Sequence, residues 1–208
     1  MDLTKLFREE QIQFPLTYLN DLVNSILNVD NEYCNWEARH ITLQKSERVF
    51  AYELYHQFKS LTKNKTEYLN TRFDGEIGKQ IYQVADNCGI DINTNQLDYS
   101  PDLVLHKSQT DSNEENQKLI VEIKARNISD EDLAKDIIKL NHYVSSLNFQ
   151  YAIFISVNTN ERTIKQKIRR IFSIVTANRL FANFKRIIVI NYKNRVITAE
   201  RLYNLITD

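Results

Sequence analysis

The stretch SPDLVLHKSQTDSNEENQKLIVEIKAR, residues 100–126, decides the predicted fold. It contains two apolar, strand-like segments that are separated by a polar, glycine-free loop at residues 107–117. The first segment opens with Pro101 and Asp102, and the second ends with Glu122, Ile123 and Lys124. Side chains two residues apart on a strand share a face, so Glu122 and Lys124 project together. If the two strands pair, Asp102 lies beside Glu122.

Two carboxylates and one ammonium group in a small volume point to a cation site. Neighbouring carboxylates raise each other's pKa unless a cation lies between them. Oxygen ligands of this kind suit Mg²⁺ or Mn²⁺. Such a metal lowers the pKa of a bound water and stabilises charge that develops on a phosphodiester. Lys124 would then orient the attacking water and neutralise a phosphate oxygen. The alternative is that both strand ends simply face water.

The segments around this stretch predict an α/β fold with a mixed sheet flanked by helices. The apolar spacing predicts a helix from Pro15 to Leu27 and a second helix that Ser46 caps. Alternation at residues 69–77 predicts a strand whose inner face holds Leu69 and Phe73. The remaining expected elements are a short helix at 78–87, strands at 96–106 and 118–125, a helix capped by Ser129, a buried strand at 151–157, a helix at 161–181 and a final pair of strands at 186–192 and 195–202.

The helix at residues 46–61 offers a further carboxylate. Glu47 falls on the same helical stripe as Phe50 and other apolar residues, and a buried carboxylate is costly without a partner. Glu53 lies near the edge of that stripe, so Glu47 is preferred for the site. Glu47 could instead be a first-turn acid stabilised by the helix dipole. Glu76, on the strand at 69–77, is an additional candidate for the same cluster.

The motif in this order of elements resembles the PD-(D/E)xK nuclease superfamily, which has the restriction-endonuclease-like fold. Its core of a helix, a three-stranded meander, a helix and a further strand is similar to residues 46–157. The P-D matches Pro101 and Asp102, and the E-x-K matches Glu122 and Lys124. The resemblance covers about half of the chain. Together with the helical pattern of the first 43 residues, it predicts an N-terminal helical appendage, residues 1–43, and a nuclease-like domain, residues 44–208.

The resemblance implies a Mg²⁺-dependent (or Mn²⁺-dependent) endonuclease that hydrolyses nucleic acid, with DNA as the expected partner and a role in defence or repair. The implied catalytic residues are Glu47, Asp102, Glu122 and Lys124; the implied metal ligands are Asp102, Glu122 and the Ile123 carbonyl, with Glu47. Two alternatives stay open at this point. One is a catalytically silent nucleic-acid-binding module of the same fold, and the other is a subunit that depends on a partner protein docked through the appendage. A homodimer is expected by analogy only.

The distribution of charge favours a polyanionic partner only weakly. Residues 1–104 hold 10 Lys/Arg and 16 Asp/Glu, whereas residues 105–208 hold 17 and 11, so the halves carry about −6 and +6. On the helix at 161–181, Arg162, Lys165 and Arg169 lie opposite the apolar stripe, where they could follow a phosphate backbone or simply face water. The chain has no segment apolar enough to suggest a membrane span, and a cytoplasmic protein is expected.

Overall fold

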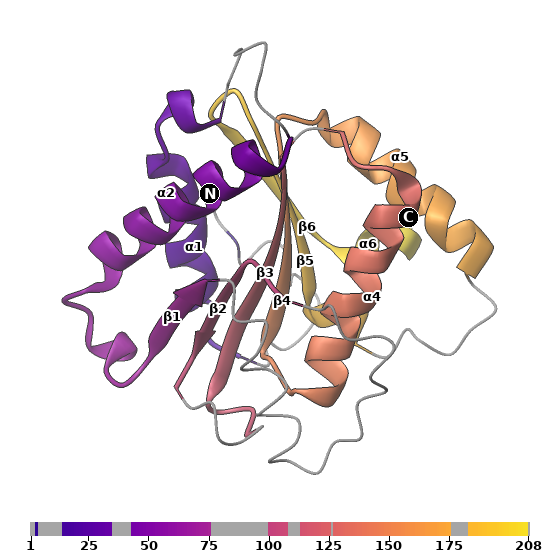
Figure 1. Cartoon of the computed structure of the whole chain (residues 1–208). Coiled ribbons are helices and arrows are strands. Elements are labelled where there is room, and N and C mark those ends of the chain that lie inside the picture. Colours follow the sequence, from indigo (N-terminus) through magenta and orange to yellow (C-terminus); the bar gives the residue numbers. More distant parts are fainter. Residues whose placement is uncertain are drawn as a thin grey trace.

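A six-stranded mixed sheet forms the centre of the molecule (Figure 1). The computed structural model describes residues 3, 14–34, 43–75, 100–107, 113–125, 127–175 and 183–207. The strands lie side by side in chain order: β1 (Arg72–Gly75), β2 (Leu103–His106), β3 (Gln117–Ala125), β4 (Tyr151–Val157), β5 (Ile187–Lys193) and β6 (Val196–Arg201). β1, β2 and β3 are antiparallel, β3, β4 and β5 are parallel, and β6 is antiparallel to β5.

Helices cover both faces of this sheet. α1 (Thr17–Asn28) and α2 (Leu43–Thr62) lie on one face, and α4 (Asp130–Ser146), α5 (Glu161–Val175) and α6 (Leu202–Thr207) lie on the other, as Figure 1 shows. Parallel neighbours cannot be joined by a tight hairpin, and each needs a crossover. α4 provides the crossover from β3 to β4, and α5 lies between β4 and β5. Three short 3₁₀ helices, Asn31–Tyr33, Thr66–Tyr68 and Phe184–Arg186, complete the described elements.

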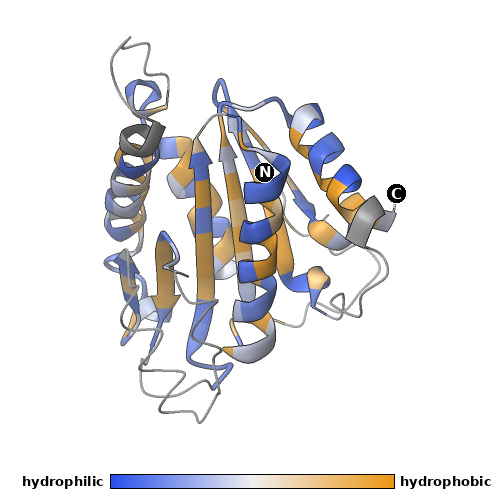
Figure 2. Ribbon diagram, turned by 45° about the vertical axis from the view of Figure 1, so that its right-hand side comes forward, coloured by the Kyte–Doolittle hydropathy of each residue, from blue (hydrophilic) through white to orange (hydrophobic). Residues whose placement is uncertain are grey.

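The sheet separates two apolar cores because successive side chains of a strand point to opposite faces. Leu119 and Val121 of β3 pack towards α1 and α2, whereas Ile120 packs towards α4 and α5. All seven residues of β4 are buried, as expected for a strand that is covered on both faces. Figure 2 shows the apolar strands between helices whose outer surfaces are hydrophilic. A charged residue on β3 therefore faces an apolar layer unless it lies at the end of the strand.

The predicted order of a helix, three strands, a helix and a strand is present as α2, β1, β2, β3, α4 and β4. Ser129 caps α4 as predicted: its hydroxyl accepts a hydrogen bond from the Asp132 amide at 3.0 Å. The strands predicted near 151–157, 186–192 and 195–202 are also present. The expected helix at 78–87 lies outside the described residues.

Two local predictions are wrong, and one described helix was not predicted. α2 begins at Leu43, so Ser46 lies within the helix and is not its N-cap. Leu69 precedes β1 in a turn and is 67% exposed, whereas Phe73 is buried as expected. The turn forms because the short 3₁₀ helix at Thr66–Tyr68 ends there, which delays the start of β1 to Arg72. α6 was missed because six residues after a strand are too few to show a helical period.

The segment that was expected to form an N-terminal appendage contributes α1. Leu19, Leu22 and Ile26 of α1 are fully buried, and they belong to the same apolar cluster as Phe50 of α2 and Val121 of β3. The predicted boundary between residues 43 and 44 falls in the first turn of α2, which begins at Leu43, and residues 35–42 lie outside the described residues. In the part of the chain that the structure covers, no helix is both long and apolar enough to cross a membrane.

The cap of α4 gives a test of how firmly this helix is held. We expect Ser129→Ala to lower the free energy of unfolding by about 1 kcal/mol, because the first turn of α4 loses the acceptor for the Asp132 amide. Ser145→Ala is the matched control, since its exposed hydroxyl donates only to the His142 carbonyl near the other end of α4. Urea unfolding monitored by circular dichroism measures both variants. Equal midpoints for the two variants would contradict the prediction.

Candidate functional site

The pairing of β2 with β3 places the predicted motif residues together. Leu103 faces Val121 in the antiparallel register, so the residue before β2 meets the second half of β3. The Asp102 amide donates to the Val121 carbonyl at 3.1 Å. The Ile123 amide donates to Asp102 Oδ2 at 2.6 Å. These two bonds fix the Asp102 carboxylate beside Glu122.

Glu122 is a carboxylate in an almost water-free position. The residue is 2% exposed, and its Oε1 atom has no hydrogen-bond partner among the described residues. Burial raises the pKa of Glu122 well above its usual range, and the neighbouring Asp102 raises it further. Burial likewise raises the pKa of Asp102, although the bond from the Ile123 amide partly offsets this. A cation that reaches such a buried carboxylate stabilises its ionised form.

Lys124 lies between carboxylates from the two helical layers. Its Nζ atom is 4.0 Å from Glu47 Oε2 of α2 and 3.6 Å from Asp136 Oδ2 of α4. Burial alone would lower the pKa of Lys124, but Asp136, Glu47 and Glu122 together raise the pKa above its ordinary value. Lys124 is therefore a fixed positive charge at the end of β3.

Glu47 connects α2 to the end of β3. Its Oε1 atom accepts a hydrogen bond from the Ala125 amide at 3.3 Å, and burial raises its pKa. The helix dipole acts most strongly on the first turn of a helix. Because α2 begins at Leu43, Glu47 lies beyond that turn. Glu53, by contrast, accepts a hydrogen bond from Gln57 Nε2 at 2.6 Å along the same helix. The structure thus brings Glu47 to the motif residues and leaves Glu53 in a local pair; Glu76 lies outside the described residues.

Two members of the cluster, Asp136 and Lys139 of α4, were missed by sequence reasoning. Asp136 is 3% exposed, and its Oδ2 atom lacks a hydrogen-bond partner within the described chain. Lys139 Nζ is 3.3 Å from Asp136 Oδ1 and 3.9 Å from Glu122 Oε1. A signal was available: Asp136 lies three residues after Leu133 and four before Leu140, which places it on the buried stripe of the helix.

The six side chains form one network with an excess of negative charge. Its members are the carboxylates of Glu47, Asp102, Glu122 and Asp136 and the ammonium groups of Lys124 and Lys139. Four negative and two positive charges leave a formal charge of −2 when all are ionised. This excess, together with the buried carboxylate oxygens that lack a hydrogen bond among the described residues, favours occupation by a cation. No three His, Cys, Asp or Glu side chains of the described residues, however, are arranged as a ready-made metal site.

The predicted basic ridge on α5 is only partly available to a ligand. Lys165 Nζ lies 2.7 Å from Glu161 Oε1 and 2.8 Å from Glu200 Oε2, so its charge is already compensated. Arg169 Nε donates to the Leu205 carbonyl at 3.3 Å, and Arg162 is exposed. The ion pair with Glu200, which β6 carries over the helix, was not predicted from the sequence.

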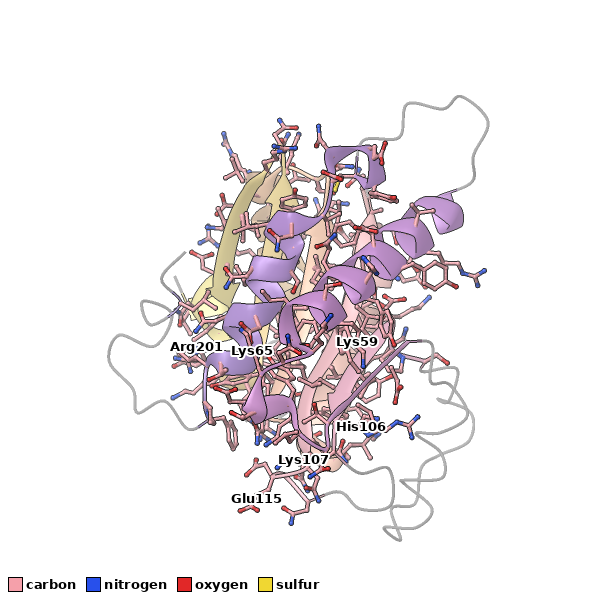
Figure 3. The ribbon with its side chains drawn as sticks, turned by 90° about the vertical axis from the view of Figure 1, so that its left-hand side faces the viewer. Lys59, Lys65, His106, Lys107, Glu115 and Arg201 are labelled. Atoms are coloured by element: carbon pink, nitrogen blue, oxygen red, sulfur yellow. The ribbon has the colours of Figure 1, made fainter. Side chains whose placement is uncertain are left out.

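A second group of basic residues lies at the other end of the β2–β3 pair. Figure 3 looks onto the α1 and α2 layer and shows Lys107 and Glu115 near His106, at the end of the sheet opposite Asp102. A cavity of about 230 Å³ lies at the C-terminal end of α2, and Lys59 and Lys65 are among its lining residues. Lys65 is paired there with Asp21 at 2.6 Å. This cavity does not adjoin the motif residues, so it offers no route to them.

Comparison with protein families, with curated proteins and with solved structures found no match to this chain. The chemistry of the site therefore has to be inferred from its own residues.

The raised pKa of Glu122 predicts how stability depends on pH. Between the ordinary pKa of glutamate and the raised value, the folded chain holds a proton that the unfolded chain has lost. The free energy of unfolding therefore falls as pH rises through this window and stays low above it. We expect Glu122→Gln to weaken this dependence and to stabilise the metal-free chain at pH 7 by about 1–2 kcal/mol, because an amide has neither a charge to desolvate nor a proton to take up on folding.

Urea unfolding of the metal-free protein at several pH values measures this effect. Glu53→Gln is the matched control, since it makes the same change on a carboxylate that is held within α2. Identical pH dependence in the wild type and in Glu122→Gln would contradict the prediction.

Proposed function

We propose that the chain is a metal-dependent nuclease of the PD-(D/E)xK type, which hydrolyses phosphodiester bonds in nucleic acid. The observation that carries this proposal is the convergence of Asp102, Glu122 and Lys124 at one end of the β2–β3 pair, with Glu47 beside them. A strand pair without such a function has no physical need to hold two desolvated carboxylates together. The arrangement has a cost in stability that ligand binding would offset.

The architecture supports the same proposal. α2, the antiparallel strands β1 to β3, the crossover helix α4 and the parallel strand β4 follow the order of the restriction-endonuclease-like core. In that core the P-D and E-x-K residues lie on the second and third strands of the meander, which correspond here to β2 and β3. Fold alone does not establish function, so the proposal rests on the site.

The residues present fit a hard divalent cation in their chemistry. Asp102, Glu122 and the Ile123 carbonyl would hold Mg²⁺ or Mn²⁺, with Glu47 as a further carboxylate. The observation of this structure that favours a cation is the buried Glu122 Oε1, which has no hydrogen bond among the described residues. When bound, the ion would lower the pKa of a water and offset charge that builds up on the phosphate. Because no three acidic, His or Cys side chains of the described residues are arranged as a ready-made metal site, we infer that water and substrate oxygens would complete the coordination.

The chain's own residues have separate parts in this reaction. Asp102 is oriented by the Ile123 amide, so its carboxylate keeps one position relative to β3. Lys124, held at the end of the same strand, would orient the attacking water and neutralise a phosphate oxygen. Glu47 lies close enough to Lys124 to keep it charged. DNA is the expected substrate, and Arg162 and Arg169 are candidates for contacts with its backbone.

One observation favours a catalytically silent nucleic-acid-binding module of the same fold. Lys124 already lies within 4.0 Å of two carboxylates, so the charges of the network partly satisfy one another without a metal. Such a module would bind nucleic acid in a salt-dependent manner. It would not cleave the nucleic acid, whichever divalent metal ion is added. A partner-dependent enzyme would cleave only when its partner is added.

Cleavage assays distinguish these functions. We expect the wild type to degrade DNA in Mg²⁺ or Mn²⁺, and we expect Lys124→Ala to reduce the rate by about 10²–10³-fold, because one fixed charge at the phosphate is lost. Asp102→Ala should abolish cleavage while circular dichroism shows that the fold survives. Glu53→Gln is the control and should keep the wild-type rate. Normal cutting by both the Asp102 and the Lys124 variants would refute the assignment.

Metal binding gives a test that does not depend on the substrate. We expect calorimetric titration of Mn²⁺ to show binding by the wild type and at least a tenfold weaker affinity in the double variant Asp102→Ala/Glu122→Ala, because the two carboxylates that would hold the ion are removed. Glu53→Gln should bind like the wild type. Equal affinities in the wild type and the double variant would place the metal elsewhere.

A further inference from the structure

Asp136 makes contacts that the proposed nuclease mechanism does not yet use. It lies on α4, in the helical layer opposite Glu47, and it is almost completely buried. Its Oδ1 atom faces Lys139 Nζ at 3.3 Å, and its Oδ2 atom faces Lys124 Nζ at 3.6 Å. The Oδ2 atom has no hydrogen-bond partner among the described residues.

We propose that Asp136 is a positioning residue, which holds the Lys124 ammonium group over the carboxylates of Asp102 and Glu122. This inference rests on the proposed function for its catalytic consequence. A lysine side chain has four carbons and many rotamers, so a single carboxylate at 4.0 Å, such as Glu47, restrains it poorly. Asp136 lies closer to the Lys124 ammonium group than Glu47 does, at 3.6 Å, and it approaches from the other side of the sheet. The two carboxylates together confine Lys124 to the space between α2 and α4.

Lys139 supports this arrangement from the next turn of α4. It lies three residues after Asp136, so both side chains occupy the same face of the helix. Its ammonium group lies between Asp136 and Glu122, where it limits the repulsion between the two acids. The ion pairs thus form a chain from Glu47 to Lys124, Asp136, Lys139 and Glu122. In this series of ion pairs, Asp136 is the only described carboxylate that lies within 4.0 Å of both Lys124 and Lys139.

A stabilising role alone does not account for this geometry. A buried ion pair repays the loss of solvation only when its oxygens are well hydrogen-bonded. Asp136 Oδ2 accepts no hydrogen bond from any described residue. An apolar residue on the same stripe of α4, beside Leu133 and Leu140, would pack without this cost. The position is therefore better explained by its effect on Lys124.

The test compares Asp136→Asn, Asp136→Glu and the control Glu131→Gln, which removes an exposed carboxylate paired with Lys135 on the same helix. We expect Asp136→Asn to lower kcat for Mg²⁺-dependent DNA cleavage by about 10- to 100-fold with KM within about twofold of wild type, because Lys124 is misplaced at the phosphate. Asp136→Glu should recover most of the rate, and Glu131→Gln should change nothing. If Asp136→Asn does not fold by circular dichroism, Asp136→Glu carries the comparison through its kcat.

The double variant Lys124→Ala/Asp136→Asn separates positioning from an independent effect. If Asp136 acts through Lys124, the double variant cleaves no more slowly than Lys124→Ala. A further loss by the same factor as in the single Asp136→Asn variant would overturn the proposal. An unchanged kcat in Asp136→Asn would also overturn it.

Crystal structures of the wild type and Asp136→Asn give a readout that needs no activity. We expect Lys124 Nζ to move away from its place between Glu47 and residue 136 in the variant. An unmoved Lys124 side chain overturns the positioning role, whatever the kinetics show. If the wild type cleaves no nucleic acid, the nuclease proposal fails by itself, and the displacement of Lys124 still decides whether Asp136 holds it.

Discussion

The rest of the site depends on one pairing: the backbone of residue 102 against β3. Because the Asp102 amide bonds to the Val121 carbonyl and the Ile123 amide bonds to the Asp102 carboxylate, the register of β2 on β3 is fixed at the position where the charges must meet. A slip of one residue would exchange the two faces of β3. Glu122 and Lys124 would then point into the apolar layer beneath α1 and α2, and Val121 and Ile123 would face α4. The apolar pattern of β3 and the positions of its charged residues Glu122 and Lys124 therefore select the same register.

Much of this arrangement could be predicted from the sequence, because the signals are local. Strand alternation puts Glu122 and Lys124 on one face, and the buried stripe of α2 singles out Glu47 over Glu53. The parallel strand β4 was recognisable from its unbroken apolar run. The predictions were wrong where the signal was weak or depended on tertiary contacts. Ser46 is a good capping residue in isolation, yet the helix begins before it. The ion pair between Lys165 and Glu200 was not predicted because the two residues lie 35 positions apart in sequence.

Asp136 and Lys139 show a different limit. Each has an ordinary sequence context, and a charged residue among leucines and isoleucines on a helix is easily taken for the edge of the polar face. The helical spacing of Asp136 indicates that it lies on the buried stripe, but only the packing of α4 across β3 reveals that it meets Lys124. The network lowers the stability of the fold, because burial raises the pKa of three of its carboxylates, Glu47, Asp102 and Glu122. Proteins accept such local destabilisation where a ligand or a reaction requires it.

The position of Lys124 between two helical layers has a consequence for biosynthesis. Its partners come from α2, which precedes the sheet, and from α4, which follows β3 and must cross over before β4 can add to the sheet. A nascent chain that has emerged only as far as β3 carries both motif carboxylates and Lys124, but it lacks the acid that confines the lysine from the second side. The complete arrangement exists only after the helix that closes the crossover has docked. A charged cluster built in this way stays incomplete on the ribosome until the helices that cover the sheet are in place.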